Sequence, residues 1–520
     1  MSDDVAVRLV DHPPSARPFA VLLAAVAVLA AAGCTDGDDR GDGPTTASTP
    51  GTESPAGPSP TLVDADCPDP TTPSGSGADG RITCRRLVVP ESRSRPDERQ
   101  VELPVLTFAP AGDVAAAPSS AAPVVYLHGG PGGGATQQWA TWSTVADALG
   151  TEVVVYDQRG GGASVPRLDC PEHADALADG LGAADDPELE RSVVADALSA
   201  CHDRLVRDGV DLSEYDVDAS VADLDDLRRA LGAEQLRLVA SSYGTRLALE
   251  YAAAHPDRAA SLALDSLDPP GATLPGGDAR ALDPAVERLL DACSADPSCA
   301  TAHPDLGSSL DAAVSRADRT PLVIETPATD ERPAGRFTLT GDDLLAGLFA
   351  AMYDSELIPL LPAAIDAIAA GDDSVLASVG PRVVPALSAG SIGALLSVNC
   401  AATSASSPVE PPVGASTIAL TGWDPYCQEW PVDASASAAH GVEPGVPVLV
   451  VAGELDPITP ATTSRRLADT WGATLVEVPR AGHTPMLVDP CARAVLRSFL
   501  ADPDAVDTAC VSRLAPTPFA

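Results

Sequence analysis

The feature that most constrains the fold is a series of short, continuously apolar segments separated by helical patterns. Segments such as Pro123–His128 (PVVYLH) and Pro447–Ala452 (PVLVVA) do not alternate apolar with polar residues, as expected of strands buried on both faces of a parallel sheet. The predicted strands are 82–89, 101–108, 123–128, 152–156, 236–240, 260–265, 447–452 and 474–478. Strands that alternate with helices predict an α/β fold, with a mostly parallel, doubly wound sheet of eight strands.

The clearest helical pattern lies between two of these strands. Apolar residues recur every three or four positions from Val221 to Leu231, Ser220 is the predicted N-cap, and Gly232 marks the end.

The strand series is interrupted over residues 271–395. Helical patterns occupy 284–294, 341–353 and 356–371. A chain of 520 residues is also too long for one compact core. An inserted helical cap over 271–395 explains both observations, and it divides the core into a first part, 67–270, and a second part, 396–520.

The amino-terminal part is typical of an export signal followed by a tether. Phe19–Ala32 is continuously apolar but shorter than the ~20 residues that a membrane-spanning helix needs. It leads into Gly33 and Cys34, an arrangement that resembles a bacterial lipoprotein signal over residues 1–33, with Cys34 as the lipidated residue. Residues 34–66 are rich in Thr, Ser, Pro and Gly, which predicts a disordered tether. The protein is therefore expected outside the cell, anchored through Cys34; secretion after an ordinary cleaved signal is the alternative.

Cysteine usage agrees with export. The 11 cysteines less Cys34 leave ten, and these form pairs of sequence neighbours. The predicted disulfides are Cys67–Cys84, Cys170–Cys201, Cys293–Cys299, Cys400–Cys427 and Cys491–Cys510. A metal site is not expected, because the sequence has neither CxxC pairs nor histidines at ligand spacing.

The balance of charge excludes several classes of function. The formal net charge is −42, from 74 acidic and 32 basic residues, and every basic residue is arginine. Without lysine, Schiff-base chemistry, a Ser-Lys dyad and a Walker-type phosphate loop are excluded. Nucleic acid would be repelled over most of the surface, so no nucleic-acid partner is expected. No cofactor is expected either. Contact with a membrane is expected only through Cys34, and no oligomeric state is predicted.

The sharpest chemical signal is ASSYGT, residues 240–245, at the end of the apolar strand LRLVA. A serine on a tight strand-to-helix turn presents its hydroxyl above the sheet, at a helix N-terminus that favours developing negative charge. The pattern is Gly-x-Ser-x-Gly with Ala240 in place of the first glycine, so Ser242 is the candidate nucleophile and Ser241 is the neighbour to exclude. An ordinary capped helix is the structural alternative.

A serine nucleophile needs a base, and the base needs an orienting carboxylate. Asp456 lies just past the strand PVLVVA, and His483 lies in a loop after the next predicted strand. Their places at strand ends and the order Ser242, Asp456, His483 predict a catalytic triad.

A glycine run, HGGPGGG (residues 128–134), follows the strand PVVYL. Backbone amides in such a run can approach a ligand closely, and with the serine turn downstream they suit an oxyanion hole. We assign this hole to the amides of Gly130 and Tyr243. The rival interpretation, a dinucleotide-binding loop, lacks the acidic residue expected after a second strand.

Five motifs in order, HGGPGGG, DQRGGGAS (residues 157–164), SSYGT, GELDPITP and AGHTP, resemble the proline iminopeptidase and tripeptidyl aminopeptidase branch of the α/β-hydrolases. CQEWP is similar to the Cys-x-x-Trp-Pro element of its secreted actinobacterial members, whose carboxyl-terminal part is called TAP-like. The resemblance spans about residues 67–510. It implies an α/β-hydrolase fold and a cap that limits access to chain ends, with Asp157 and Arg159 pinning loops near the site.

The function that this resemblance implies is that of a secreted serine exopeptidase, which releases residues from peptides with a free N-terminus. Ser242 attacks the carbonyl, His483 takes its proton and Asp456 orients the imidazole. Two alternatives stay open: a carboxylesterase or lipase-type hydrolase of acyl esters, and a non-catalytic binding lipoprotein. No residue is assigned to binding the substrate amine.

Overall fold

The computed structural model describes residues 60–73, 80–111, 122–180, 187–270, 282–326, 335–376, 390–402, 426–435 and 443–520. All of them belong to the second of two compact units, Gly57–Ala520. The predicted signal peptide, Cys34 and most of the predicted tether lie outside the described residues. None of the helices in the described ranges is both long and apolar enough to cross a membrane.

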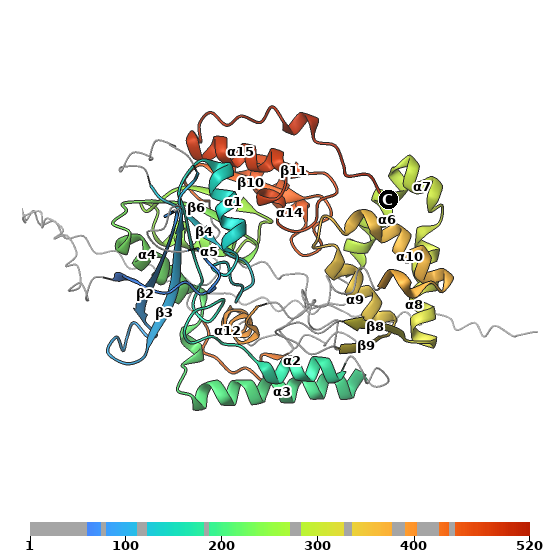
Figure 1. Cartoon of the computed structure of the whole chain (residues 1–520), viewed down its shortest axis with the longest axis horizontal. Helices are drawn as coiled ribbons and strands as arrows, with labels where there is room; N and C mark the ends of the chain where they lie inside the picture. The colour runs from blue at the N-terminus through green and yellow to red at the C-terminus, as the bar shows by residue number, and fades with distance from the viewer. Residues whose placement is uncertain are drawn as a thin grey trace, which may run out of the picture. The chain divides into compact units, whose positions relative to one another are not determined.

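The core of the described unit is a nine-stranded sheet with the order β1-β2-β3-β5-β4-β6-β7-β10-β11 (Figure 1). Its strands are β1 (Thr61–Asp64), β2 (Ile82–Pro90), β3 (Gln100–Phe108), β4 (Val124–Leu127), β5 (Val153–Tyr156), β6 (Leu236–Ser241), β7 (Ala259–Asp265), β10 (Val448–Gly453) and β11 (Thr474–Val478). The six strands from β5 to β11 in this order pair in parallel, and β1, β2 and β3 add an antiparallel edge. The mostly parallel sheet agrees with the sequence prediction.

The prediction of eight strands is wrong by one strand, and so is the carboxyl-terminal limit of the tether. β1 lies inside the predicted tether of residues 34–66, and its Leu62 is paired with Leu87 of β2. Thr61–Val63 is a short apolar and β-branched run in an otherwise polar segment, so composition concealed it. The disulfide Cys67–Cys84 holds the segment that follows against β2.

Helices cover both faces of the sheet because successive strand side chains point to opposite faces. Val124 and Tyr126 of β4 pack in the cluster that contains α1 (Trp139–Leu149) and α15 (Pro490–Ala501). Val125 and Leu127 pack in the cluster that contains α4 (Val217–Ala230), α5 (Tyr243–Ala254) and α14 (Ala461–Trp471). Helices thus cover both faces of the sheet, which is doubly wound.

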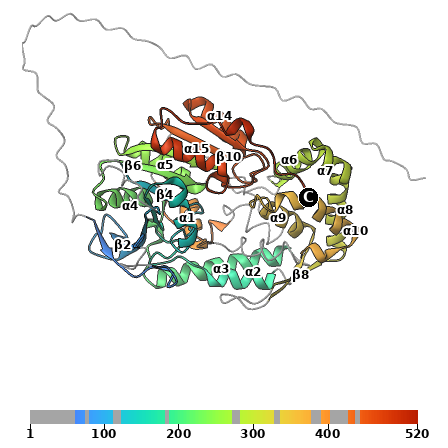
Figure 2. The same ribbon diagram turned by 45° about the horizontal axis from the view of Figure 1, so that its top comes forward.

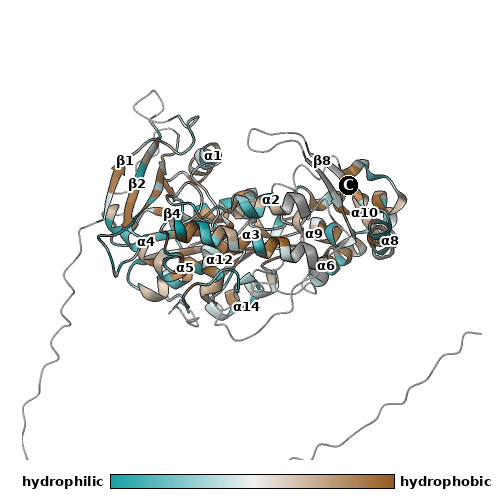
Figure 3. Cartoon of the chain, turned by 90° about the horizontal axis from the view of Figure 1, so that it is seen from below, coloured by the Kyte–Doolittle hydropathy of each residue, from teal (hydrophilic) through white to brown (hydrophobic). Residues whose placement is uncertain are grey.

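In Figure 3, brown segments run along the strands β1 and β2, whereas α4 carries hydrophilic teal.

The remaining helices lie around this core and in the insertion. They are α2 (Pro171–Gly180), α3 (Pro187–Arg207), α6 (Leu282–Ala295), α7 (Pro297–Ala302), α8 (Leu306–Arg319), α9 (Gly341–Ala351), α10 (Leu361–Ala370) and α12 (Ile392–Ala402). The short 3-10 turns are η1 (Leu212–Glu214), η3 (Ile358–Leu360), η4 (Asp373–Val375), η6 (Pro485–Leu487) and η7 (Val511–Arg513).

The N-cap of α4 is Asp216 and not the predicted Ser220. The Asp216 carboxylate accepts a hydrogen bond from the Ala219 amide at 2.8 Å, and α4 begins at Val217. Ser220 lies one turn inside the helix, where its hydroxyl donates to the carbonyl oxygen of Asp216 at 2.9 Å. Both residue types suit an N-cap, so only the backbone conformation distinguishes them.

Between β7 and β10 the chain forms α6–α10, which we call the cap segment and define as the described residues 282–326 and 335–376. In Figure 2 these helices group together, and the carboxyl-terminal end of the chain lies beside them. The cap segment also contains a hairpin of β8 (Leu322–Thr326) and β9 (Gly335–Leu339), which the purely helical prediction missed. Within the described residues these strands pair with each other and not with the nine-stranded sheet. Leu322–Ile324 is an apolar run of only three residues, too short to stand out among the helical patterns on either side.

Disulfides join all five predicted pairs of cysteines, from Cys67–Cys84 to Cys491–Cys510. The bridge Cys400–Cys427 connects α12 to the CQEWP segment. Trp430 of that segment is fully buried, and its indole N–H donates to the Ser397 hydroxyl at 2.9 Å. The Cys-x-x-Trp-Pro element therefore fastens α12 to the core.

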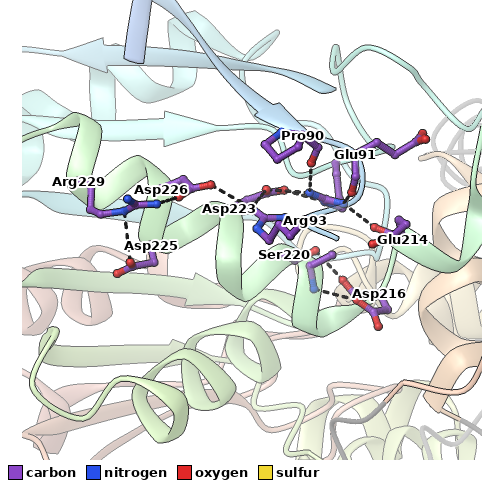
Figure 4. Close-up of polar contacts among 12 residues, drawn as sticks. Pro90, Glu91, Arg93, Glu214, Asp216, Ser220, Asp223, Asp225, Asp226 and Arg229 are labelled. Carbon is purple, nitrogen blue, oxygen red and sulfur yellow. Dashed lines mark hydrogen bonds and ion pairs between the residues drawn. The ribbon is translucent and has the colours of Figure 1, made fainter. Parts of the chain in front are cut away.

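Arg159 and Asp157 connect loops at the carboxyl-terminal ends of the strands. The buried guanidinium of Arg159 makes two hydrogen bonds to Asp223 of α4, at 2.7 and 2.8 Å. Arg93 also donates to Asp223, and the two residues point toward one another in Figure 4. Burial raises the pKa of Asp223, but the charges of Arg159 and Arg93 outweigh it and hold that pKa below its usual range.

Asp157 accepts from the amides of Ala135 and Ala163, at 2.7 and 2.8 Å.

Candidate active site

Ser242 lies on the sharp turn between β6 and α5. Its backbone has φ 54° and ψ −128°, a left-handed φ that side-chain-bearing residues rarely adopt. The Ser242 amide donates to the carbonyl oxygen of Asp265 at 2.9 Å, and Thr245 donates to the Ser242 carbonyl through both its amide and its hydroxyl. Ser242 is partly exposed, whereas Ser241 is buried. Of these two neighbouring serines, Ser242 is therefore the more accessible to a substrate.

Glycines allow two other segments to approach this turn closely. A Cβ on Gly244 would lie 2.2 Å from the carbonyl oxygen of Leu127, so α5 can start against the end of β4 only with glycine there. A Cβ on Gly129 would lie 2.8 Å from the Cβ of Ser242. The predicted glycine-rich loop thus passes directly beside the candidate nucleophile.

The two amides assigned to the oxyanion hole belong to this neighbourhood. Tyr243 is the first residue of α5, so its N–H has no acceptor within the helix. Gly130 has φ 131°, and a Cβ there would lie 2.7 Å from the Gly133 amide nitrogen. Within the described part of the chain, no hydrogen bond uses the Gly130 or the Tyr243 amide. The assignment of these two amides to an oxyanion hole stays a prediction.

Asp456 follows β10 and has no exposed surface. Its carboxylate accepts five hydrogen bonds, which are Ile458 N (3.0 Å) and Thr459 N (2.9 Å) to Oδ1, and Ser266 Oγ (2.7 Å), Thr459 Oγ1 (2.7 Å) and His483 Nδ1 (2.8 Å) to Oδ2. Burial alone would raise the pKa of Asp456, but the His483 charge and these hydrogen bonds together hold it below its usual range. The group is an anion at neutral pH and can only accept.

His483 lies in the loop after β11, with its Nδ1 against Asp456. Because the carboxylate can only accept, the hydrogen-bond pattern assigns the proton to Nδ1 and leaves the lone pair on Nε2. In the described residues, no hydrogen bond joins His483 to the Ser242 hydroxyl. The structure therefore brings Asp456 and His483 into direct contact and places Ser242 at the end of β6, which β7 separates from β10 in the sheet.

Residues of the cap segment that the sequence analysis missed contact the His483 loop. The His483 amide donates to the carbonyl oxygen of Tyr353 at 3.1 Å, and the two rings lie 5.0 Å apart, edge to face. The Gly482 amide donates to the Ser355 hydroxyl at 2.9 Å. A Cβ on Gly482 would lie 2.1 Å from the carbonyl oxygen of Met352. Because Gly482 has no side chain, the sequence indicated that another segment of the chain could approach the His483 loop closely. Nothing in the sequence indicated that this segment is the end of α9.

Thr459 and Ser266, which donate to Asp456, were also missed. Thr459 had a local signal, because an aspartate carboxylate commonly accepts from the backbone amides two and three residues later, as Asp456 does from Ile458 and Thr459. Ser266 had none, since it precedes Asp456 by 190 residues.

Two further buried carboxyl groups lie near the site. Asp265 accepts from the Met486 amide at 3.0 Å, and burial together with the charge of Asp456 raises its pKa well above the usual range. Asp268 accepts from Arg246 at 3.0 Å. Burial raises the pKa of Asp268, and Arg246 only partly offsets that effect.

The chain is similar to known proteins over most of its length. The family model described as alpha/beta hydrolase fold matches residues 122–490. Serine protease Hip1 of Mycobacterium tuberculosis is 26% identical over 466 residues, which cover 81% of this chain and 85% of that protein. Tripeptidyl aminopeptidase of Streptomyces lividans is 28% identical over 198 residues, which cover 36% of this chain and 35% of that protein. The crystal structure of proline iminopeptidase from Mycobacterium smegmatis aligns with a TM-score of 0.39 and 19% identity, over 81% of this chain and 98% of that one. Because the family model covers more than half of the sequence, the chain belongs to the alpha/beta hydrolase fold family, and it is a serine hydrolase of that family.

Proposed function

We propose that this protein is an exported serine exopeptidase of the aminopeptidase type, which cleaves peptides from a free N-terminus. The observation that carries the proposal is the pair of Asp456 and His483, 2.8 Å apart, at the same edge of the sheet as the Ser242 turn, with β7 between β6 and β10. An imidazole held by a buried carboxylate and a partly exposed serine on a strained turn are the parts that acyl transfer requires.

In the proposed mechanism the Ser242 hydroxyl attacks the scissile carbonyl carbon. Nε2 of His483 takes the hydroxyl proton and then gives it to the leaving amine, which leaves an acyl ester on Ser242. Water activated by His483 hydrolyses that ester. Asp456 holds the imidazole and balances its positive charge. The Gly130 and Tyr243 amides donate to the oxyanion, and the loss of one such donor costs ~3 kcal/mol of transition-state stabilisation.

The preference for chain ends is inferred from the cap segment and the relatives. The cap segment contacts the His483 loop through Tyr353 and Ser355, so it stands beside the reacting groups. A cap in that place limits access by the middle of a long polypeptide. Relatives of this chain include proteins named tripeptidyl aminopeptidase and proline iminopeptidase.

Export is proposed on separate grounds. Five disulfides form among the described residues, and disulfides persist in oxidising compartments outside the cytoplasm. We propose lipid attachment at Cys34, tested by metabolic labelling with a radioactive fatty acid in a bacterium that processes lipoproteins. The native chain should become labelled, and Cys34→Ala should not.

The experiment that tests the activity compares fluorogenic peptidyl amides of one, two and three residues, each with a free and with an acetylated N-terminus. Cleavage of the free forms and loss of the acetylated forms is expected. Equal turnover of both forms, with faster cleavage of simple acyl esters, would instead identify a carboxylesterase. An absence of both turnover and fluorophosphonate labelling would indicate a non-catalytic binding protein.

A further inference from the structure

Ser266 has a backbone conformation that its residue type disfavours. It directly follows β7, is fully buried, and has φ 56°, in the left-handed region where glycine is the default. Its amide donates to the carbonyl oxygen of Val451 at 2.9 Å, which continues the pairing of β7 with β10 for one more residue. Glycine would meet the backbone requirement without strain, so the serine side chain must supply something that the backbone alone does not.

The Ser266 hydroxyl connects the loops of Asp456 and His483. Its oxygen lies 2.7 Å from Oδ2 of Asp456 and 2.8 Å from the amide nitrogen of Thr484, the residue after His483. The direction of both bonds is determined, because an amide can only donate and an ionised carboxylate can only accept. The single hydroxyl proton of Ser266 therefore points at Oδ2 of Asp456, the same oxygen that accepts the hydrogen bond from Nδ1 of His483.

The residue before Ser266 extends this connection to the third loop. The carbonyl oxygen of Asp265 accepts from the Ser242 amide at 2.9 Å, and its carboxyl accepts from the Met486 amide at 3.0 Å. Asp265 and Ser266, two adjacent residues at the end of β7, thus contact the Ser242 turn, the Asp456 loop and the His483 loop. We propose that Ser266 is a positioning residue, whose hydroxyl holds Asp456 and the His483 loop in the arrangement that lets the pair act on Ser242. This inference rests on the proposed function.

Loss of this hydroxyl should affect turnover more than substrate binding. Without it, Oδ2 of Asp456 keeps Thr459 and His483 as partners, but the carboxylate loses one restraint on its rotation and the His483 loop loses its anchor at Thr484. Ser266 is fully buried and has no surface for substrate, so KM should change little. A carboxylate with one donor fewer attracts the imidazolium more strongly, so the acid limb of the pH profile should move toward higher pH.

The test compares Ser266→Gly and Ser266→Ala with a control, Ser261→Ala. The glycine variant removes the hydroxyl and also relieves the strained φ, so its loss of activity cannot be attributed to backbone strain. Ser261 is a buried serine of the same strand, β7. We expect kcat to fall about 10- to 100-fold in both Ser266 variants, the range for a hydrogen bond to a charged group, and to change less than about twofold in the control.

The measurements are kcat and KM on a cleaved peptidyl amide, the pH profile, the rate of fluorophosphonate labelling, and Tm. Wild-type kcat and an unshifted acid limb in the folded Ser266→Gly variant would overturn the proposal. Ser266→Cys provides a second test, because a thiol of similar shape is a weaker donor: an intermediate kcat is expected, and wild-type kcat would count against the inference. If Ser242→Ala keeps turnover, the proposed function itself is wrong. If Ser242→Ala is inactive while Ser266→Gly is fully active, only the role of Ser266 is wrong.

Discussion

The backbone amide of His483 donates a hydrogen bond to the carbonyl oxygen of Tyr353 at 3.1 Å, and their rings meet edge to face with centroids 5.0 Å apart. Tyr353 follows α9 of the cap segment, whereas His483 belongs to the loop after β11. The inserted helices are thus attached to the proposed base itself. A change in the cap segment can therefore alter the chemistry as well as access to the site.

Replacing Tyr353 should separate the effect of its ring from that of its backbone. Tyr353→Ala keeps the carbonyl oxygen that accepts from His483 but removes the edge-to-face contact, which contributes about 0.5–1.5 kcal/mol. A roughly 2- to 10-fold lower kcat/KM is expected. Tyr353→Phe keeps the ring and should stay near the wild-type value. Steady-state kinetics on a free-amine peptidyl amide measure both, and equal losses in the two variants would show that the hydroxyl, not the ring, matters.

The contact between Gly482 and the cap segment should not tolerate a side chain. A Cβ on Gly482 would lie 2.1 Å from the carbonyl oxygen of Met352, so Gly482→Ala must push the His483 loop away from α9. We expect a loss of about 1–3 kcal/mol in the free energy of unfolding, together with a lower kcat. Gly347→Ala is the matched control in α9, because nothing lies within 4 Å of its added Cβ. Denaturant unfolding compares the two, and equal stabilities would contradict this reading of the contact.

The neighbouring carboxyl groups of Asp456 and Asp265 should give stability opposite dependences on pH. The folded-state pKa of Asp456 is lowered, so its ionised form stabilises the fold above the ordinary aspartate pKa of about 3.9, and that contribution is lost as the pH falls through the folded-state pKa. The folded-state pKa of Asp265 is raised. Its contribution is present below about 3.9 and is lost as the pH rises toward that raised value.

Asn variants of these two residues test the sign. Asp265→Asn resembles the protonated form, so the stability of this variant should decline less than that of the wild type between about pH 4 and pH 8. Asp456→Asn should instead remove part of the stability that the wild type gains on leaving acid pH. Thermal unfolding across the pH range measures both. Equal declines in Asp265→Asn and in the wild type over this range would show that the pKa of Asp265 is not raised in the folded protein.

Ser242 and Ser241 should differ sharply in their reaction with an active-site probe. Ser242→Ala is expected to abolish fluorophosphonate labelling and to lower kcat by at least about 10⁴-fold, since the nucleophile is lost. Ser241 is buried, so Ser241→Ala should still be labelled. Mass spectrometry of the labelled wild-type peptide should find the modification on Ser242. A modification on another serine would refute the assignment.

Local patterns predicted much of the fold because they depend on residues that are close in the chain. The apolar runs around Val125, Val154, Val239 and Val450 became β4, β5, β6 and β10, since continuous apolar sequence suits a strand covered on both faces. Local patterns failed where two nearby residues offered the same chemistry, since Asp216, and not Ser220, caps α4. They also failed where an apolar run was very short: the run that contains Leu62 forms an edge strand of the sheet, although the composition of its segment predicted a tether.

Patterns along the chain were enough to predict the alternation of strands and helices, the pairing of cysteines that are near neighbours, and the choice of Asp456 and His483 as partners, which meet at 2.8 Å. The surroundings of that pair depend on the tertiary fold. Ser266 reaches Asp456 across 190 residues, because β7 lies beside β10 in the sheet, and Tyr353 reaches His483 from an insertion between those two strands. Hydrogen bonds of this kind depend on which strand ends become neighbours in space, and no spacing along the chain encodes that.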